Sequence, residues 1–233
     1  MTHAEINKLD ITLRPAKGGD LAVEGLDART ALGKAVRIAL PLVQERRGTT
    51  IRDTEGVARR LATAALDLFE AHGFDNVTVT DIAERAGVTS RTFFRYFPNK
   101  ETIVLDIWDQ TNRDLIQAIT VVAAQGTVLS VLKEATTAWI DEHHALLVGL
   151  AAITGLSRTL SSGVLQQSSE WEEHIADALL KRMPQLDRYV ADMSGVVAMG
   201  ALRVASRRVL ADRVELALEV KRLLDALGFG AID

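Results

Sequence analysis

Apolar residues recur at helical spacing through almost all of the chain after residue 54. In the segment 55–72 they occupy positions i, i+4, i+7 and i+8, which form one stripe along a helix. These positions are Leu61, Ala65, Leu68 and Phe69. Gly73 follows the stripe and supplies the left-handed residue that commonly ends a helix. The pattern therefore predicts an amphipathic helix over residues 55–72.

Capping residues and helix breakers predict three further helices directly downstream. Thr78 has an acidic residue three positions later, the spacing of a capping box, which predicts a short helix ending at Gly87. Thr89 is suited to cap the next short helix, which Pro98 stops. Asn99 then caps a long helix that we expect to run to about residue 125.

The remainder of the chain predicts helices only. Their expected ranges are 127–143, 145–160, 165–182, 187–210 and 212–227. No run alternates apolar and polar residues between glycine turns, as a strand pair would. The sequence therefore predicts an all-α fold in three parts: an extension over residues 1–48, a small helical domain over 49–101 and a larger helical domain over 102–233.

The extension over residues 1–48 has two interpretations. Prolines and glycines break its first 25 residues, which favours a partly ordered segment with no required role. A modest helical pattern from Ala28 to Pro41 instead allows an extra helix that packs on the core or on a partner subunit. The pair Arg46-Arg47 is either a basic arm that contacts DNA phosphate or an ordinary surface pair.

Composition and charge exclude several classes of function. The 233 residues include 27 Lys and Arg, 31 Asp and Glu and no Cys, so thiol nucleophiles, disulfides and thiolate metal sites are excluded. A net charge of -4 argues against a protein that coats nucleic acid along its whole length. The acidity belongs mainly to residues 102–233, which leaves room for a small basic face upstream. The apolar stretches 145–156 and 193–202 are too short to cross a bilayer, so we expect a soluble, cytoplasmic protein with no membrane contact.

The segment 78–97 has the order helix, glycine turn, helix. Phe93 and Phe97, four residues apart, are expected in its apolar interior. Arg91 and Arg95 then project from the opposite face of the second helix, a geometry suited to reaching base edges in DNA.

The residues from Leu66 to Glu101, LDLFEAHGFDNVTVTDIAERAGVTSRTFFRYFPNKE, strongly resemble the DNA-binding domain of TetR-family transcriptional repressors. The resemblance runs without gaps over about residues 55–105. It implies a homodimeric regulator that places two such domains on a palindromic double-stranded operator. It also implies a C-terminal domain that binds a small molecule and thereby releases the DNA.

The same resemblance suggests which side chains contact DNA. Phosphate contacts are implied for Thr78, Thr92, Tyr96 and Lys100. Ser90, Arg91 and Arg95 are candidates for base edges, because arginine suits the paired acceptors of guanine. Thr89 is either a DNA contact or only a helix cap. Where the family often has Tyr, this chain has Phe94, which retains the ring for a thymine methyl or a sugar but cannot donate to phosphate.

The larger domain offers weaker signals. Trp139 with His143, and Trp171 with His174, are candidates for lining an effector cavity; the alternative is a core tryptophan beside a solvated histidine. We find no metal-ligand spacing, no phosphate loop and no nucleophile motif, so neither an enzyme nor a cofactor is expected.

Small and apolar residues between 192 and 205 predict a helix that is covered on several sides. With the last helix it either forms half of a homodimer interface over about residues 187–227 or is an intramolecular core helix. The sequence thus predicts a DNA-binding transcriptional regulator, most simply a repressor released by a ligand. The alternative is an all-helical protein interaction module that keeps the scaffold without operator binding.

Overall fold

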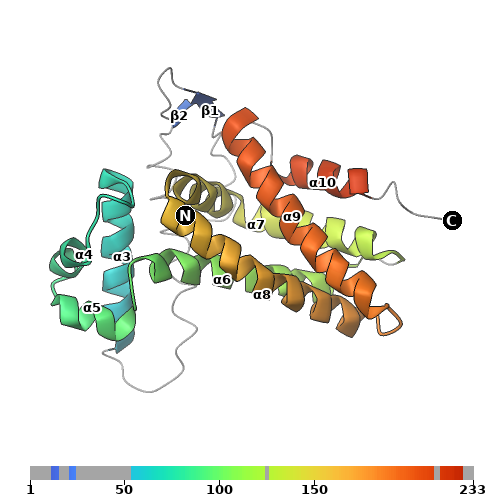
Figure 1. Cartoon of the computed structure of the whole chain (residues 1–233), viewed down its shortest axis with the longest axis horizontal. Coiled ribbons are helices and arrows are strands. Elements are labelled where there is room, and N and C mark those ends of the chain that lie inside the picture. Colours follow the sequence, from blue (N-terminus) through green and yellow to red (C-terminus); the bar gives the residue numbers. More distant parts are fainter. Residues whose placement is uncertain (1–11, 16–20, 25–53, 124–125, 213–215, 228–233) are drawn as a thin grey trace. The chain divides into compact units, whose positions relative to one another are not determined.

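The structure, a computed structural model, describes residues 12–15, 21–24, 54–123, 126–212 and 216–227 (Figure 1). Within these residues every element except one short ribbon is a helix, as the sequence predicts. The ribbon pairs β1 (Thr12–Pro15) with β2 (Leu21–Glu24) in antiparallel register. It was not predicted, because four residues are too few for strand alternation to be recognised. The helical pattern after residue 27 and the Arg46-Arg47 pair lie outside the described residues.

The first four helices agree with the predicted ranges to within a few residues. They are α3 (Thr54–His72), α4 (Val79–Arg85), α5 (Ser90–Tyr96) and α6 (Glu101–Val121). Gly73 adopts a positive φ of 81° directly after α3, which is the left-handed conformation expected of a residue that ends a helix. Asn99 accepts a hydrogen bond from the N–H of Thr102 at 2.9 Å and so caps α6, as predicted.

Two predicted helix boundaries are wrong. Residues 127–143 and 145–160 were expected to be separate, but α7 (Val128–Leu156) is continuous through residue 144. Residues 141–144 are polar but include neither glycine nor proline, so they do not interrupt the backbone hydrogen bonds of the helix. Helix α8 (Arg158–Arg182) begins seven residues earlier than predicted, so Gly163 lies inside it. A Cβ atom on Gly163 would lie 3.2 Å from a methyl group of Leu105, so glycine there allows close packing.

The chain ends in α9 (Arg188–Asp212) and α10 (Leu216–Leu227), which match the last two predicted helices. The chain divides into two compact units. Unit 1 contains Met1–Gln110 and Ala145–Gly163, and unit 2 contains Thr111–His144 and Val164–Asp233. Helices α6, α7 and α8 therefore each belong partly to both units. The predicted domain boundary after residue 101 stays a prediction.

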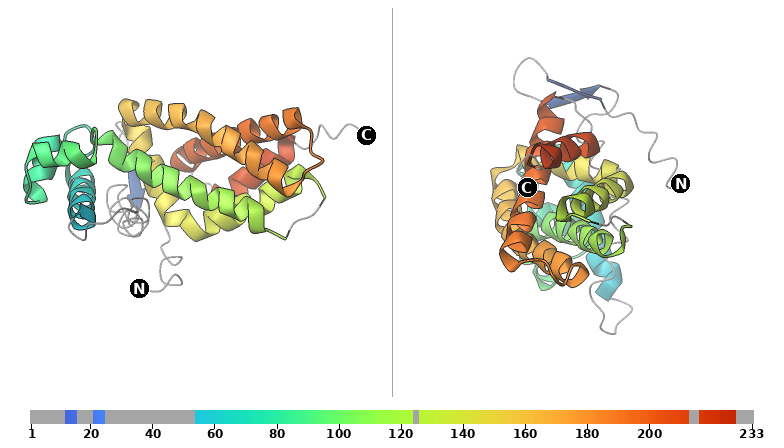
Figure 2. Two further views of the ribbon diagram at one scale, coloured as in Figure 1. Left: turned by 90° about the horizontal axis from the view of Figure 1, so that it is seen from below. Right: turned by 90° about the vertical axis from the view of Figure 1, so that its right-hand side faces the viewer.

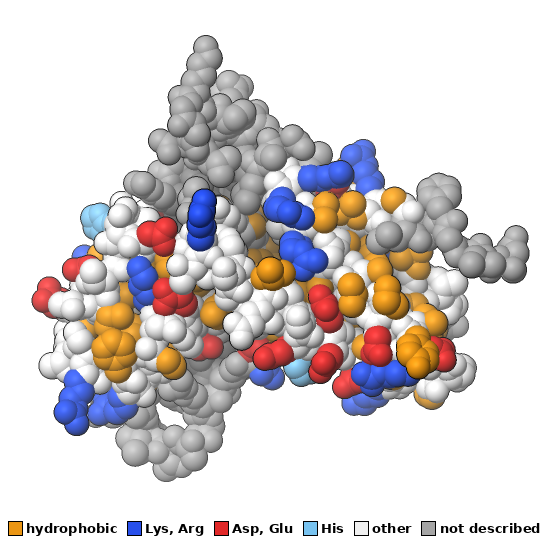
Figure 3. Space-filling view, in the orientation of Figure 1, with side chains coloured by type: hydrophobic (Ala, Val, Ile, Leu, Met, Phe, Trp, Pro, Cys, Tyr) orange, Lys and Arg blue, Asp and Glu red, His pale blue; other side chains and the backbone are white. Residues whose placement is uncertain are grey.

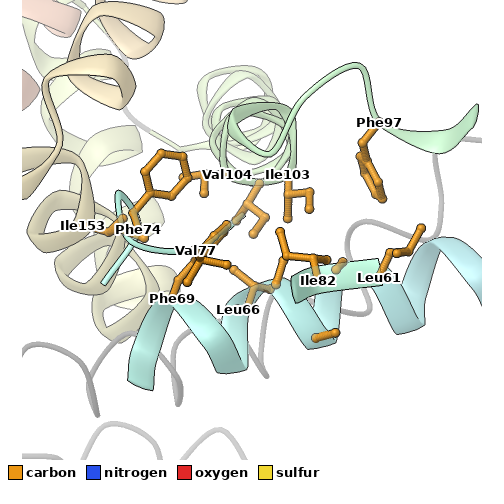
Figure 4. Close-up of a cluster of buried hydrophobic side chains, with 14 of the residues drawn as sticks. Leu61, Leu66, Phe69, Phe74, Val77, Ile82, Phe97, Ile103, Val104 and Ile153 are labelled. Atoms are coloured by element: carbon orange, nitrogen blue, oxygen red, sulfur yellow. The ribbon is translucent and has the colours of Figure 1, made fainter. Parts of the chain in front are cut away.

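The core of unit 1 includes side chains of the helix-turn-helix segment (Figure 4). Helices α3 to α6 contribute fully buried side chains, among them Phe69, Ile82, Phe93 and Ile107. The second half of α7 adds Leu146, Leu150 and Ile153, and α8 adds Leu160. Each large side chain buried in this way contributes roughly 1.5–3 kcal/mol, so the segment is held on the unit by packing as well as by its caps.

In unit 2, α8 and α9 approach each other closely. A Cβ atom on Gly195 of α9 would lie 2.1 Å from the carbonyl oxygen of Glu172 on α8. Three further small residues of α9 are also buried within the chain: Ala198, Ala201 and Ala205. This small-residue face of α9 is therefore buried within the chain, and the homodimer interface over about residues 187–227 stays a prediction. At the end of α8, Arg182 donates to the carbonyl oxygens of Thr120 on α6 and of Val122 directly after it, at 3.0 and 2.6 Å.

Among the described residues no single helix is long and apolar enough to cross a membrane, although the bent pair formed by Leu146–Gly155 and Arg158–Arg182 passes the same test of length and composition.

Candidate nucleic-acid interface

Helix α4 begins with a complete capping box. The N–H of Asp81 donates to the hydroxyl oxygen of Thr78 at 3.2 Å, while the backbone N–H and hydroxyl of Thr78 donate to the Asp81 carboxylate at 2.8 and 2.7 Å. The Thr78 hydroxyl, and after it the Thr78 backbone N–H, hold the pKa of Asp81 below its ordinary value. The Thr78 side chain therefore already has partners in the chain and sets where α4 starts.

The turn between α4 and α5 depends on one glycine. Gly87 has a φ of 69°, and its N–H donates to the carbonyl of Glu84 at 3.0 Å. The N–H of Val88 donates to the carbonyl of Ala83 at 2.9 Å, which closes the end of α4. The left-handed backbone at this one position turns the chain so that α5 can begin three residues later.

Helix α5 is capped by Thr89, whose hydroxyl accepts from the N–H of Thr92 at 3.2 Å. The two threonine hydroxyls are also within hydrogen-bond distance of each other, at 3.1 Å. The cap considered for Thr89 from the sequence is thus present. Contacts of Thr89 and Thr92 with DNA stay predictions.

The two faces of α5 differ as the sequence predicts. Phe93 and Phe97 are buried, with ring centroids 5.7 Å apart. Arg91, Phe94 and Arg95 are exposed, and 57% of the Phe94 surface is accessible to solvent. Ser90 is half-buried at the start of the helix. Phe94 leans its ring edge-on against Phe93 at 5.6 Å, so an aromatic side chain is held in place between two exposed cations.

Tyr96 and Lys100, which were expected to contact phosphate, also form hydrogen bonds within the protein that the sequence did not predict. Tyr96 is only 6% exposed, and its hydroxyl accepts from Arg95 at 3.2 Å. The Lys100 ammonium donates to the carbonyls of Phe74 and Val77, both at 2.7 Å, and lies 4.4 Å from the centroid of the Phe74 ring. An ammonium has three N–H donors, so Lys100 retains one for a phosphate. No spacing rule links residue 100 to residues 74 and 77, and only the fold brings them together.

Figure 3 shows this region of the surface: Lys and Arg side chains gather beside exposed hydrophobic side chains over α5. The arrangement combines planar cations, a fixed aromatic ring and the exposed N-terminal side chains of two short helices. Such a surface suits a negatively charged, grooved partner with stacked bases, since guanidinium groups pair with phosphates and with the acceptors of guanine.

The two Trp-His pairs expected in the larger domain lie in unit 2 and differ from each other. The indole N–H of Trp139 donates to the carbonyl of Thr111 at 2.7 Å, and His143 lies 3.3 Å from the carboxylate of Asp114. Trp171 is 4% exposed, and its buried indole N–H has no hydrogen-bond partner. His174 packs against Trp171, with ring centroids 4.9 Å apart, but is exposed to solvent. Over the described part of the chain, no group of three or more His, Asp or Glu side chains is placed to hold a metal ion.

Comparison with known proteins places the helix-turn-helix segment in one family. Residues 61–107 match the model of bacterial regulatory proteins of the tetR family. Over 72 residues the chain is 40% identical to the uncharacterized HTH-type transcriptional regulator YdeS of Bacillus subtilis, a match that covers 31% of this chain and 35% of YdeS. Over 46 residues it is 48% identical to the HTH-type transcriptional regulator TcmR of Streptomyces glaucescens, covering 20% of each chain. The chain thus aligns with about a third or less of the length of these relatives.

The likeness in fold extends further than the likeness in sequence. The crystal structure of FadR from Thermus thermophilus, a TetR-family transcriptional repressor in complex with lauroyl-CoA, superposes with a TM-score of 0.55 at 24% identity. The superposition covers 76% of this chain and 95% of FadR, so it includes helices beyond the helix-turn-helix segment. Together with the capping box, the glycine turn and the exposed face of α5, these matches show that residues 61–107 are similar to the tetR family of bacterial regulatory proteins, and that the chain shares its fold with a solved structure of a TetR-family repressor.

Proposed function

We propose that the chain is a transcriptional regulator that binds a double-stranded operator through α5. The observation that carries this proposal is the exposed face of α5, where Arg91, Phe94 and Arg95 project beside buried Phe93. An α-helix fits the major groove of B-form DNA, and arginine pairs with O6 and N7 of guanine. Ser90, Arg91 and Arg95 contact base edges in this arrangement, and Phe94 contacts a thymine methyl or a sugar.

The remaining candidates hold the protein against the phosphates. Thr78 and Thr89 lie at the starts of α4 and α5, where hydroxyl and backbone N–H groups commonly meet phosphate oxygens. Thr92, Tyr96 and Lys100 complete this set, with the third N–H of Lys100 directed at DNA rather than at the carbonyls of Phe74 and Val77.

A DNA-selection experiment tests the proposal. Duplexes are selected from a random library with the full-length protein, and affinity is measured at several salt concentrations. We expect Arg91→Ala to weaken the selected duplex by about 5- to 150-fold and to relax the preference at one base pair. The control Lys181→Ala, at an exposed position near the end of α8, should leave affinity unchanged. If no sequence is enriched, the operator-binding proposal fails and the interaction module is favoured instead.

We propose further that the regulator is a homodimer that joins through α9 and α10. Tyr189, Met193 and Val196 lie at i, i+4 and i+7 on α9 and are 81%, 60% and 43% exposed. The opposite, small-residue face of α9 is already buried within the same chain, with Gly195 against α8, which leaves this apolar stripe for a second copy. Two copies also supply the two recognition helices that a palindromic operator needs.

Sedimentation of the full-length protein tests the dimer. Met193→Glu places a charge in the proposed interface, and we expect it to shift the protein to monomer at micromolar concentration. Leu165→Glu, at a similarly exposed apolar position on α8, is the control and should remain dimeric. A Met193→Glu variant that sediments as the wild type would contradict this interface.

The ligand that releases the operator is proposed to bind in unit 2 beside Trp171. Within unit 2, α6 and α8 run in the same direction (Figure 2), and Arg182 of α8 donates to the carbonyl of Val122, directly after α6. Three helical turns earlier on both helices, Trp171 is therefore level with Thr111 and the buried Asn112. A buried N–H without an acceptor is costly, so a ligand that supplies one gains affinity there.

The expected ligand has an apolar body and one hydrogen-bond acceptor. Lauroyl-CoA, which binds the structurally similar FadR of Thermus thermophilus, has a long acyl chain and a thioester carbonyl, so it is the first probe. We expect it to raise the melting temperature of the wild type and not that of Trp171→Phe, which keeps an aromatic ring but loses the N–H donor. Trp139, whose donor is occupied by Thr111, serves the fold in this proposal, and His143 and His174 lie at the margin of the site.

A further inference from the structure

The loop between α3 and α4 is joined to the turn between α7 and α8. The hydroxyl of Ser157, in that turn, donates to the carboxylate of Asp75 in the loop at 2.8 Å. The two residues are 82 positions apart in the chain, and both belong to unit 1. Ser157 is 1% exposed although its side chain is polar, so this hydrogen bond satisfies a buried group.

The same hydroxyl is part of the start of α8. The N–H of Leu160 donates to the Ser157 hydroxyl oxygen at 3.4 Å, and the N–H of Ser161 donates to the Ser157 carbonyl at 3.0 Å. Ser157 thus occupies the N-cap position of α8, which is where serine is favoured. A change in the position of the first turn of α8 must therefore act on the bond to Asp75.

Phe74, next to Asp75, is held from two further elements. Its ring lies in the cluster that includes Ile153 of α7 and Val104 of α6 (Figure 4). Its carbonyl accepts from Lys100, whose ammonium also lies over the ring. The loop therefore has one hydrogen bond to the α7–α8 turn, two to Lys100 directly before α6, and apolar contacts with α6 and α7.

This loop leads directly into the helix-turn-helix segment. Val77, at its end, also accepts from Lys100, and the next residue is Thr78, the cap of α4. Helices α7 and α8, at the other end of the connection, continue from unit 1 into unit 2, where Trp171 lies. A continuous helix is stiff along its axis, so a shift of α8 in unit 2 reaches Ser157 through covalent structure.

We propose that the Ser157–Asp75 hydrogen bond is the regulatory connection through which the α7–α8 turn controls the placement of α4 and α5. The inference rests on the proposed function for its biological meaning, because the connection regulates DNA binding only if α5 binds DNA. By the reciprocity of coupled equilibria, occupation of α5 by DNA must equally be felt at the α7–α8 turn.

Hydrogen exchange of the full-length protein tests the connection without DNA or effector. We expect Ser157→Ala and Asp75→Ala each to speed exchange of the amides of residues 79–86 by about tenfold, the effect of losing one hydrogen bond to a charged group. The double variant should exchange no faster than either single variant, because both substitutions remove the same bond. Asp75→Asn keeps the accepting oxygen and should stay within about twofold of the wild type.

A neighbouring serine is a matched control. Ser161 lies in the first turn of α8, and its hydroxyl donates to the carbonyl of Thr154 at 2.6 Å without touching the loop. Ser161→Ala should therefore leave exchange in α4 unchanged, although it removes a hydroxyl from the same turn. If Ser161→Ala speeds α4 as much as Ser157→Ala does, or if the effects of Ser157→Ala and Asp75→Ala add, the proposed connection is overturned.

A second measurement uses a duplex selected from a random library by the wild-type protein. Binding of this duplex should slow exchange at residues 158–163 in the wild type by at least about threefold, and Asp75→Ala should abolish that slowing while the duplex still binds. If the duplex binds tightly and exchange in these residues does not change, the regulatory connection fails and the DNA-binding function stands. If no duplex is selected, the DNA-binding function fails, and exchange in the free protein still decides whether Ser157 pins the loop.

Discussion

The α4–α5 pair and the α8–α9 pair are both two packed helices, but contacts of different range hold them. In α4–α5 the decisive contacts join residues three to five positions apart: the box of Thr78 and Asp81, the closure of Val88 on Ala83 and the cap of Thr89. In α8–α9 the decisive contact is the approach of Gly195 to the backbone of Glu172, 23 residues away.

This difference separates two sources of stability. Local contacts specify a helix start or a turn wherever the same few residues occur, so they are visible in a sequence. A long-range approach depends on how two elements meet, and a glycine within a helix carries no sign of what it faces. We therefore expect substitutions in α8–α9 to act on packing over long range, and substitutions in α4–α5 to act locally.

The largest effect is expected at Gly195. Its Cβ atom in Gly195→Ala would lie 2.1 Å from the Glu172 carbonyl oxygen, a backbone atom that cannot move aside without shifting a helix. We expect a loss of about 3 kcal/mol or more in the free energy of unfolding, measured by urea denaturation.

Gly200, five residues along the same helix, is the control for Gly195. A Cβ atom there meets only a terminal nitrogen of Arg203 at 3.9 Å. Gly200→Ala should therefore stabilise the protein by about 0.5–1 kcal/mol, the ordinary gain of alanine over glycine in a helix. Equal effects of the two substitutions would show that the approach of Gly195 to Glu172 does not limit the size of the side chain.

The second prediction separates the two faces of α5. Phe93 is fully buried, so Phe93→Ala should cost about 3–5 kcal/mol of stability. Phe94, adjacent in sequence, is 57% exposed, and Phe94→Ala should change stability by less than about 0.5 kcal/mol while weakening binding to the selected duplex. Thermal unfolding and DNA titration of both variants check this, and a Phe94→Ala protein that unfolds as readily as Phe93→Ala would contradict the assigned faces.

Features set by local contacts could be predicted from the sequence, and features set by long-range contacts could not. Phe93 and Phe97 were expected in the interior and Arg91 and Arg95 on the surface, because helical periodicity alone assigns faces in α5. The continuity of α7 was missed, although residues 141–144 include no glycine or proline, and buried residues from Leu146 onward hold the helix in the fold.

Contacts over long range could not be derived at all. The partners of Lys100 are 23 and 26 residues away, and Asp75 and Ser157 are each unremarkable in their own segments. A polar residue becomes informative only once its burial is known, and burial is a property of the folded chain.

The third prediction concerns the turn in the helix-turn-helix segment. Gly87 has a φ of 69°, and no atom lies within 4 Å of the position that a Cβ atom would take. Gly87→Ala should therefore cost only the backbone strain of a left-handed alanine, about 1 kcal/mol, without a steric clash. Urea denaturation measures this cost, and a loss as large as that of Gly195→Ala would show that the turn is not held by local conformation alone.

The smallest effect is expected from the capping box of α4 as pH falls. The hydrogen bonds from Thr78 lower the pKa of Asp81 in the folded protein, so the ionised carboxylate stabilises the fold above the ordinary pKa of an aspartate. This contribution is lost as pH falls from that ordinary value through the lowered one, because protonation removes an acceptor for Thr78. Exchange of the α4 amides, corrected for the intrinsic effect of pH, should therefore speed up in this range in the wild type. Asp81→Asn, which cannot titrate, should show no such acid-dependent step, and a step of equal size in both proteins would assign the pH dependence to another group. Because the whole effect lies between residues three positions apart, it should be confined to α4 and leave exchange in α9 unaltered.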